Sequence, residues 1–125
     1  MSHEEFVKNY NEIVKRILEF SEKARMEGLL SLESKMEQKK INDRDIFEYG
    51  MSLVIDGIDM DIIDKILSNI INQEKDEYMC TLKNIQKEAV LLIYRGTNPR
   101  IINAVLNSYT GIKLAEDEMH KLLED

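Results

Sequence analysis

Apolar residues recur at three- and four-residue steps along most of this chain, the spacing that places them on one face of an α-helix. The first series follows Ser2, which has with Glu5 the spacing of a helix N-terminal capping box. Its apolar stripe consists of Phe6, Tyr10, Ile13, Val14, Ile17, Phe20 and Ala24. The pattern therefore predicts a long N-terminal helix.

Gly28 interrupts this helical pattern, and Leu29, Leu30, Leu32 and Met36 carry the apolar positions onward. Glycine inside a helix is about 1 kcal/mol less favourable than alanine. One interpretation is a continuous helix that bends at Gly28 or is closely approached there by another backbone. The other is a helix that ends near Gly28 and restarts. The sequence alone leaves both open.

Two more helices are predicted in the middle of the chain. The first runs from Asp43 to about Ile55 and is followed by an Asp-Gly turn at 56–57, after which Asp59 fits an N-cap. The next is a long central helix from about Asp61 to Arg95, straight or bent near Asn72. We expect no break there because residues 72–76 contain neither proline nor glycine.

The last predicted helix follows a left-handed cap at Gly96. Thr97 or Asn98 would cap it, Pro99 would occupy its first position, and Gly111 would stop it. The acidic segment 113–125 would be helical or frayed. Together the elements predict an all-α fold, a small helical bundle with a long N-terminal helix and a long central helix.

The apolar positions also predict which side chains meet in the interior. We expect the following to be buried together, and Leu53→Ala to cost about 2–5 kcal/mol if its burial is complete. The predicted core residues are Ile17, Phe20, Leu53, Ile66, Ile85 and Leu106. A second apolar series is expected to stay exposed and to form a homodimer. It consists of Leu82, Ala89, Leu92 and Ile93.

Composition narrows the classes of partner. The chain has 125 residues, enough for one domain, and a formal net charge of −7. That charge argues against nucleic acid and anionic lipid as partners, because both attract basic surfaces. The single cysteine, Cys80, rules out a disulfide within the chain and is expected to be a small apolar filler in a reducing compartment.

The longest unbroken apolar run is 89–94, whereas a bilayer span needs about 20 residues. The sequence therefore predicts no membrane span, and no basic segment followed by an apolar run suggests a signal peptide.

Catalytic and cofactor-binding patterns are absent from the sequence. His3 and His120 lie near opposite ends, and no zinc, nucleophile-histidine or phosphate-loop spacing occurs. Four aspartates lack the spacing and the final glutamate of a calcium loop, and we interpret them as turn and cap residues. They are Asp56, Asp59, Asp61 and Asp64. We expect a non-enzymatic protein without metal or cofactor.

Three segments carry a resemblance to a known family. Residues 23–33 read KARMEGLLSLE, residues 50–59 read GMSLVIDGID, and residues 96–102 read GTNPRII. In this order they resemble the cytoplasmic region of MotA/PomA-type flagellar stator proteins, over roughly residues 5 to 110. The departures are mild: Met60 stands where the family often has proline, and 45–47 read DIF instead of a DPF-like element.

The resemblance implies a division of the single domain 1–125. Residues 1–72 resemble the central cytoplasmic loop, residues 73–112 the segment after the membrane, and 113–125 form an acidic tail. In that family a pair of membrane helices separates the two halves, and here about ten polar residues replace it. The chain is then either a natural soluble relative, which we favour, or a stator protein whose membrane parts have been removed.

By resemblance, the charged residues of the first segment contact the rotor protein FliG, and the matching positions are Arg25 and Glu33. On one continuous helix they would lie about 12 Å apart on neighbouring faces. The resemblance implies a cytoplasmic interaction domain, held near the membrane by FliG or stator subunits. The alternative interpretation is a structural helical homodimer whose partner is unrelated to motility, in which both residues are ordinary solvated charges.

Overall fold

The computed structural model describes residues 1–36 and 46–110 of the chain, and all regular elements in these residues are helical. The elements are α1 (His3–Glu27), the 3₁₀ helix η1 (Leu29–Lys35), α2 (Phe47–Ile55), α3 (Met60–Ile71), α4 (Glu77–Tyr94) and α5 (Pro99–Thr110). The predicted all-α bundle with a long N-terminal helix is confirmed. Ser2 caps α1 as expected, since its Oγ accepts a hydrogen bond from the Glu5 backbone N–H at 3.1 Å.

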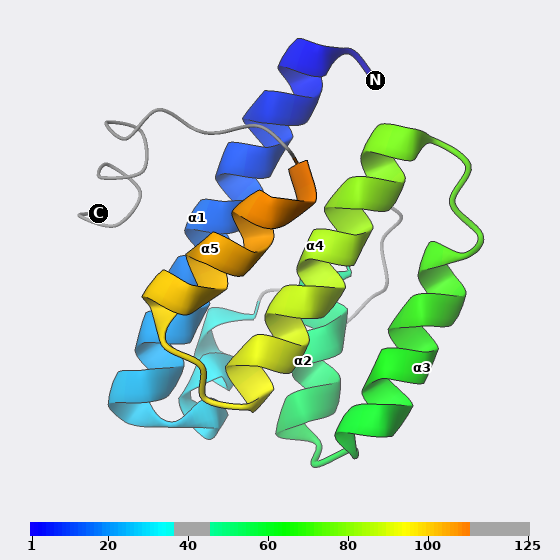
Figure 1. The fold of residues 1–125 in the computed structure, drawn as a ribbon. Helices are drawn as coiled ribbons and strands as arrows, with labels where there is room; N and C mark the ends of the chain where they lie inside the picture. Colours follow the sequence, from blue (N-terminus) through cyan, green and yellow to red (C-terminus); the bar gives the residue numbers. More distant parts are fainter. Residues whose placement is uncertain (37–45, 111–125) are drawn as a thin grey trace.

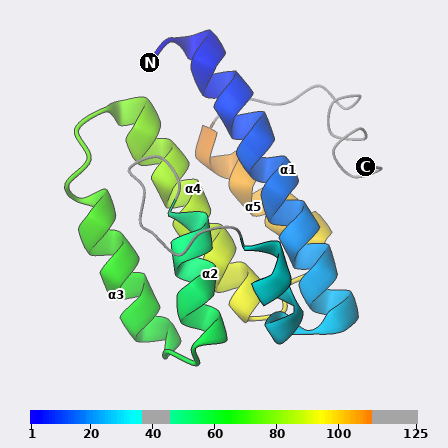
Figure 2. The ribbon, with the colours of Figure 1, turned by 180° about the vertical axis from the view of Figure 1, so that it is seen from behind.

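Helix α4 occupies the centre of the bundle and contacts α1, α2, α3 and α5 (Figure 1). Helices α1 and α5 pack together on one side of it, and α2 and α3 pack together on the other. Seen from behind, η1 lies between the end of α1 and α2 (Figure 2). The central position of α4 explains why its sequence carries apolar residues on several faces.

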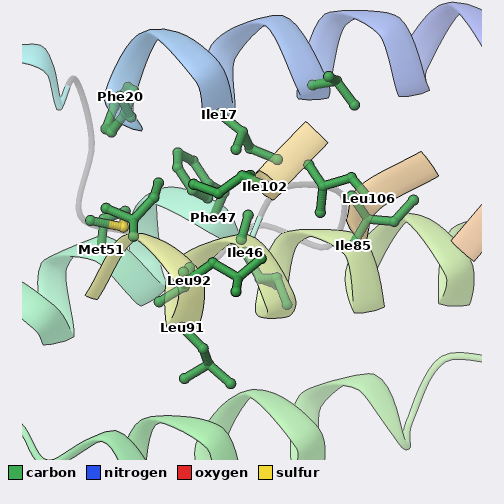
Figure 3. Packing of buried hydrophobic residues seen from close by; sticks show 14 of the residues in the cluster. Ile17, Phe20, Ile46, Phe47, Met51, Ile85, Leu91, Leu92, Ile102 and Leu106 are labelled. Atoms are coloured by element: carbon green, nitrogen blue, oxygen red, sulfur yellow. The ribbon is translucent and has the colours of Figure 1, made fainter. Parts of the chain in front are cut away.

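The interior joins side chains from α1, η1, α2, α3, α4 and α5, and Leu91 points from α4 toward α3 (Figure 3). Four of the six predicted core residues are buried: Ile17, Phe20, Ile85 and Leu106. The prediction is wrong for Leu53 and Ile66, which are only half-buried. The next residue on each helix, Val54 and Leu67, is buried instead, because successive helical residues point about 100° apart. The cost expected for Leu53→Ala assumed full burial and therefore does not apply.

The predicted long central helix is also wrong, because α3 ends at Ile71 and α4 begins at Glu77. The two helices pack side by side as a hairpin, so that Ile63, Leu67 and Ile71 are buried in the bundle. One continuous helix would carry this apolar face away from the bundle and leave it in water.

Polar side chains, rather than glycine or proline, make the turn at 72–76. The Asp76 carboxylate caps α4 by accepting the Met79 backbone N–H at 3.1 Å. The Glu74 carboxylate accepts the backbone N–H groups of Lys75 and Asp76 and forms an ion pair with the buried Lys83 at 2.8 Å. The Asp76 contact satisfies a donor that a helix start leaves unpaired, and the Glu74 contacts hold the turn against α4.

The apolar series expected to be exposed on the long helix is in the core. Leu82, Ala89, Leu92 and Ile93 are each at most 8% exposed. This part of the prediction is wrong because α4 is surrounded by four helices. The expected homodimer therefore loses the surface on which it was based.

Some predictions lie outside the described residues, namely the helix start at Asp43, the stop at Gly111 and the state of 113–125. Of the helices in the described part of the chain, none combines the length and the apolar character that a bilayer crossing requires.

Candidate functional site

The three segments that carry the family resemblance meet at one end of the bundle, although they are far apart in sequence. This end contains the last turns of α1 with η1, the α2–α3 turn and the α4–α5 turn (Figure 1). We call it the motif end and define it as residues 21–33, 56–59 and 94–100. The chain N-terminus and the α3–α4 turn lie at the opposite end.

Gly28 ends α1, so the interpretation of a helix that ends and restarts is correct and the continuous helix is wrong. Its φ of 90° lies in the left-handed region, and its N–H donates to the Ala24 carbonyl at 2.9 Å. The restart is a 3₁₀ helix, in which the Ser31 hydroxyl donates to the Gly28 carbonyl at 2.6 Å. The fully buried Leu32 anchors η1, and Lys35 lies 3.9 Å from the Glu19 carboxylate, so the chain folds back along α1.

Arg25 and Glu33 are both exposed, one on the last turn of α1 and the other on η1. Neither makes an ion pair within residues 1–36 and 46–110. The separation of about 12 Å expected on one helix does not apply, because the chain reverses between them. In the part of the chain that the structure describes, both charged groups are therefore exposed, and no ion pair ties either of them to the fold.

The α2–α3 and α4–α5 turns share one geometry. In each, a glycine with positive φ donates its N–H to the third residue before it, and the following residue donates to the fifth residue before itself. This is the Schellman motif, and it explains Gly57 and Gly96. The glycines of these two segments are therefore structural.

The start of α5 follows the sequence-based expectation. The Asn98 side-chain oxygen accepts the Arg100 backbone N–H at 2.8 Å, so Asn98 rather than Thr97 is the cap, and Pro99 is the first helical residue. Asp59 occupies the N-cap position of α3 as predicted, although its side chain makes no capping hydrogen bond.

A small open cleft of about 110 Å³ lies at the motif end, between α1 and the α4–α5 turn. One wall comes from α1 and the start of η1: Ser21, Ala24, Arg25 and Leu29. The other comes from the end of α4 and the turn: Ile93, Tyr94, Gly96 and Thr97. Sequence reasoning missed this cleft, because its walls are about 70 residues apart and no local pattern records that they are neighbours.

Exposed apolar side chains accompany the charges at this end. Met26 is 76% exposed and Leu30 is 72% exposed, the two highest values among the large apolar residues described. Arg95, directly after α4, and Arg100, in the first turn of α5, are also exposed. Two highly exposed apolar side chains therefore lie at the same end of the bundle as exposed charged residues.

The four aspartates of 56–64 lie in α3 or just before it. Across the described residues, no three of the usual metal-ligating side chains gather in one place. Asp64 lies 3.1 Å from Lys87, and the hydrogen bond from Lys87 holds the pKa of the Asp64 carboxyl below its usual range. Its role is therefore to join α3 to α4.

Comparison with known proteins agrees with the resemblance. The chain is 46% identical over 66 residues to Motility protein A of Borreliella burgdorferi. Over about half its length, this chain is similar to a motility protein. The match covers 53% of this chain and 24% of the relative, so the chain spans about a quarter of that protein. No protein-family model matches the chain, and no solved structure matches it.

Proposed function

We propose that this protein is a non-catalytic interaction module of a flagellar motor, which binds the rotor protein FliG or a stator subunit through its motif end. Arg25 and Glu33 make the charged contacts. The observation that carries the proposal is the placement of both residues on exposed surface, beside exposed Met26 and Leu30, where neither supports the fold. The similarity to Motility protein A supports the motility context.

Such a module acts in the cytoplasm, where its partners hold it near the inner face of the membrane. Exposed ion pairs contribute about 0.2–1 kcal/mol each, so neither charge carries the affinity alone. Charges on an interface rim mainly set the orientation and the association rate. Binding through Arg25 and Glu33 therefore weakens as salt rises, because ions screen exposed charges.

Charge reversal tests the proposal. Purified FliG is titrated by calorimetry with the wild type, with Arg25→Ala, with Glu33→Ala and with the double variant Arg25→Glu/Glu33→Arg, at low and high salt. We expect small effects of the single changes and a much larger loss for the double reversal. The matched control is Lys8→Glu/Glu12→Lys, an exposed pair on α1 away from the motif end, which also keeps the net charge.

The outcomes separate two failures. If FliG binds and the double reversal leaves its affinity unchanged at low salt, the contact surface is wrong. If neither FliG nor a stator subunit binds the wild type, the motility role is wrong, and the alternative of a structural homodimer is then tested by light scattering.

A further inference from the structure

We propose that two copies of this chain exchange halves at the α3–α4 turn and form a domain-swapped dimer. In this dimer α3 and α4 of each copy join into one continuous helix, and residues 1–71 of one copy pack against residues 77–110 of the other. The proposal concerns self-association alone, goes beyond the proposed function and does not depend on it.

The sequence of the turn favours a helix. Residues 72–76 read NQEKD, without the glycine or proline that usually interrupts a helix. The middle three, glutamine, glutamate and lysine, are strong helix formers, and the flanking asparagine and aspartate are weaker ones. The sequence alone therefore predicts one helix over about 61–95, whereas the same residues fold into a hairpin. Local preference and tertiary fold thus disagree at this turn.

The backbone of the turn is already close to a helix. Asn72 has near-helical angles, φ −63° and ψ −16°. The N–H groups of Gln73 and Glu74 donate to carbonyl groups three residues before them. Asp76, by contrast, is extended, with φ −79° and ψ 123°. The departure from helical geometry therefore lies in the last residues of the turn, where a few dihedral angles decide between a hairpin and a continuous helix.

Most contacts that hold the turn have a substitute in a continuous helix. The Met79 N–H, which the Asp76 carboxylate caps at 3.1 Å, would donate to the Lys75 carbonyl. The N–H groups of Lys75 and Asp76, which the Glu74 carboxylate accepts, would likewise reach carbonyl groups four residues before them. The ion pair of Glu74 with Lys83 has no such substitute, because nine residues rise about 13.5 Å along one helix. This ion pair therefore favours the closed hairpin.

The exchange preserves the interior of the bundle. Helix α4 contacts α1, α2 and α3, and α5 contacts α1, and each of these interfaces joins residues 1–71 to residues 77–110. In the dimer the same interfaces form between two chains, so each bundle keeps its buried side chains. The two forms then differ in the turn and in the freedom lost on association. Unlike a homodimer formed through helix faces, this dimer needs no exposed apolar surface.

The hairpin also fits two-fold symmetry. Helices α3 and α4 lie side by side in opposite directions, joined by a short turn at one pole of the bundle (Figure 1). When both hairpins open, α3 of each copy pairs with α4 of the other through the same contacts, so the assembly is complete with two copies. Asp64, which lies 3.1 Å from Lys87, would then face Lys87 of the other copy.

One variant opens the turn, and another serves as its control. Glu74→Ala/Asp76→Ala removes the ion pair with Lys83, the cap of α4 and the contact of Asp76 with the chain N-terminus at 3.5 Å. Alanine also raises the helix propensity of the turn. The control, Glu12→Ala/Glu22→Ala, removes two negative charges from exposed residues of α1 and leaves the turn intact.

The proteins are held in urea near their unfolding midpoints, returned to buffer and analysed by size-exclusion chromatography with light scattering. Because both copies open their turns, each lost contact counts twice. We therefore expect the association constant of the opening variant to exceed that of the control at least about tenfold. Adding Gln73→Gly/Lys75→Gly to the opening variant should reverse this gain, because glycine disfavours the continuous helix.

A cross-link distinguishes exchange from simple contact. The opening variant also receives Cys80→Ser and Asp64→Cys/Lys87→Cys, which place thiols on α3 and α4 where the native side chains form an ion pair. A short bismaleimide joins the two thiols. In a monomer, or in a dimer of closed bundles, the link stays within one chain. In the exchanged dimer it joins two chains, and a denaturing gel shows twice the mass of the chain.

The expected result is a dimer that is enriched in the opening variant and cross-linked between chains. The proposal is overturned if the opening variant, shown by circular dichroism to be folded, associates no more strongly than the control. It is also overturned if the dimers carry links only within chains. Should the opening variant not fold, Asp76→Ala alone, which keeps the ion pair between Glu74 and Lys83, replaces it under the same criteria.

Discussion

At the scale of the residue, Gln86 shows how one buried polar side chain joins two helices. Its Oε1 accepts the backbone N–H groups of Ile46 and Phe47 at 2.8 and 3.0 Å, and its Nε2 donates to the Leu82 carbonyl at 3.2 Å. Helix α2 has no capping side chain of its own at its N-cap, Ile46. Gln86 on α4 therefore supplies from a distance the cap that the local sequence lacks.

Replacing Gln86 with leucine should lower the free energy of unfolding by about 2–4 kcal/mol, because two buried N–H groups would lose their acceptor. Urea unfolding followed by circular dichroism measures the change. The control is Gln73→Leu on the exposed α3–α4 turn, which should stay within about 0.5 kcal/mol of the wild type. Equal stability of the two variants would show that Gln86 does not cap α2.

Tyr10 makes a second buried polar link, because its hydroxyl donates to the Asn107 side-chain oxygen on α5. Burial raises the pKa of Tyr10 to about 12, against a hydrogen bond with Thr110 that lowers it. The fold thus favours the protonated phenol. This preference stabilises the fold fully below pH 10, which is the pKa of Tyr10 in the unfolded chain. The stabilisation is lost as pH rises from 10 to 12.

The expected result is a stability gap between the wild type and Tyr10→Phe that is largest below pH 10 and narrows toward pH 12. Urea unfolding at pH 8, 10 and 12 measures it. The comparison with Tyr10→Phe removes the effect of Tyr109, whose pKa is also raised by burial and which both proteins contain. A gap that is constant with pH would contradict the assignment to Tyr10.

At the scale of the element, close approach of α2 to α4 depends on Gly50. A Cβ at this position would lie 2.7 Å from Val90 Cγ2 and 3.2 Å from Leu67 Cδ1, closer than the side chains of these fully buried residues allow. Alanine would gain about 1 kcal/mol in helix propensity and lose about 1–3 kcal/mol to overpacking. The helix therefore keeps its glycine for packing.

Gly50→Ala should accordingly destabilise the protein by up to about 2 kcal/mol in urea unfolding. Removing the obstructing methyl groups in Val90→Ala should relieve the clash. The double variant is then more stable than the sum of the single changes predicts, by more than about 0.5 kcal/mol. Strict additivity would show that Gly50 and Val90 do not pack as described.

Local signals account for the elements that the sequence predicted correctly. Ser2 and Asn98 cap N–H groups within three residues of themselves, and Pro99 lacks the N–H that the first helical position leaves unpaired. These helix starts could therefore be predicted from the local sequence. The break at 72–76 was missed although Asp76, which caps α4, is a local signal. The turn depends also on Lys83, seven residues into α4, and on the burial of the α3 face.

Part of the candidate site could likewise be predicted from the sequence, and part of it could not. The resemblance alone indicated Arg25 and Glu33, and the structure finds both exposed. Their relation to each other was left open, because a glycine at this position fits both a bend and a stop, and the decision depends on how Leu32 is buried. The cleft and the exposed Met26 became apparent only once α1 and the α4–α5 turn were placed side by side.

At the scale of the whole molecule, the five α-helices in residues 1–36 and 46–110 contain 76 of the 125 residues of the chain. Far-ultraviolet circular dichroism should therefore report more than half helix, well above the third that is usual in globular proteins. A value below half would contradict the fold. Dilution over a hundredfold range of concentration serves as the control, since a monomeric bundle keeps its helix content.

The hairpin of α3 and α4 has a consequence for where the chain can accept an insertion. Because the two helices run side by side, the end of one and the start of the other emerge together, at the pole opposite the motif end. A pair of membrane helices spliced in at 72–76 would leave and re-enter the bundle at one spot, without separating α3 from α4. We therefore expect an insertion at 72–76 to leave the packing of α3 against α4 intact.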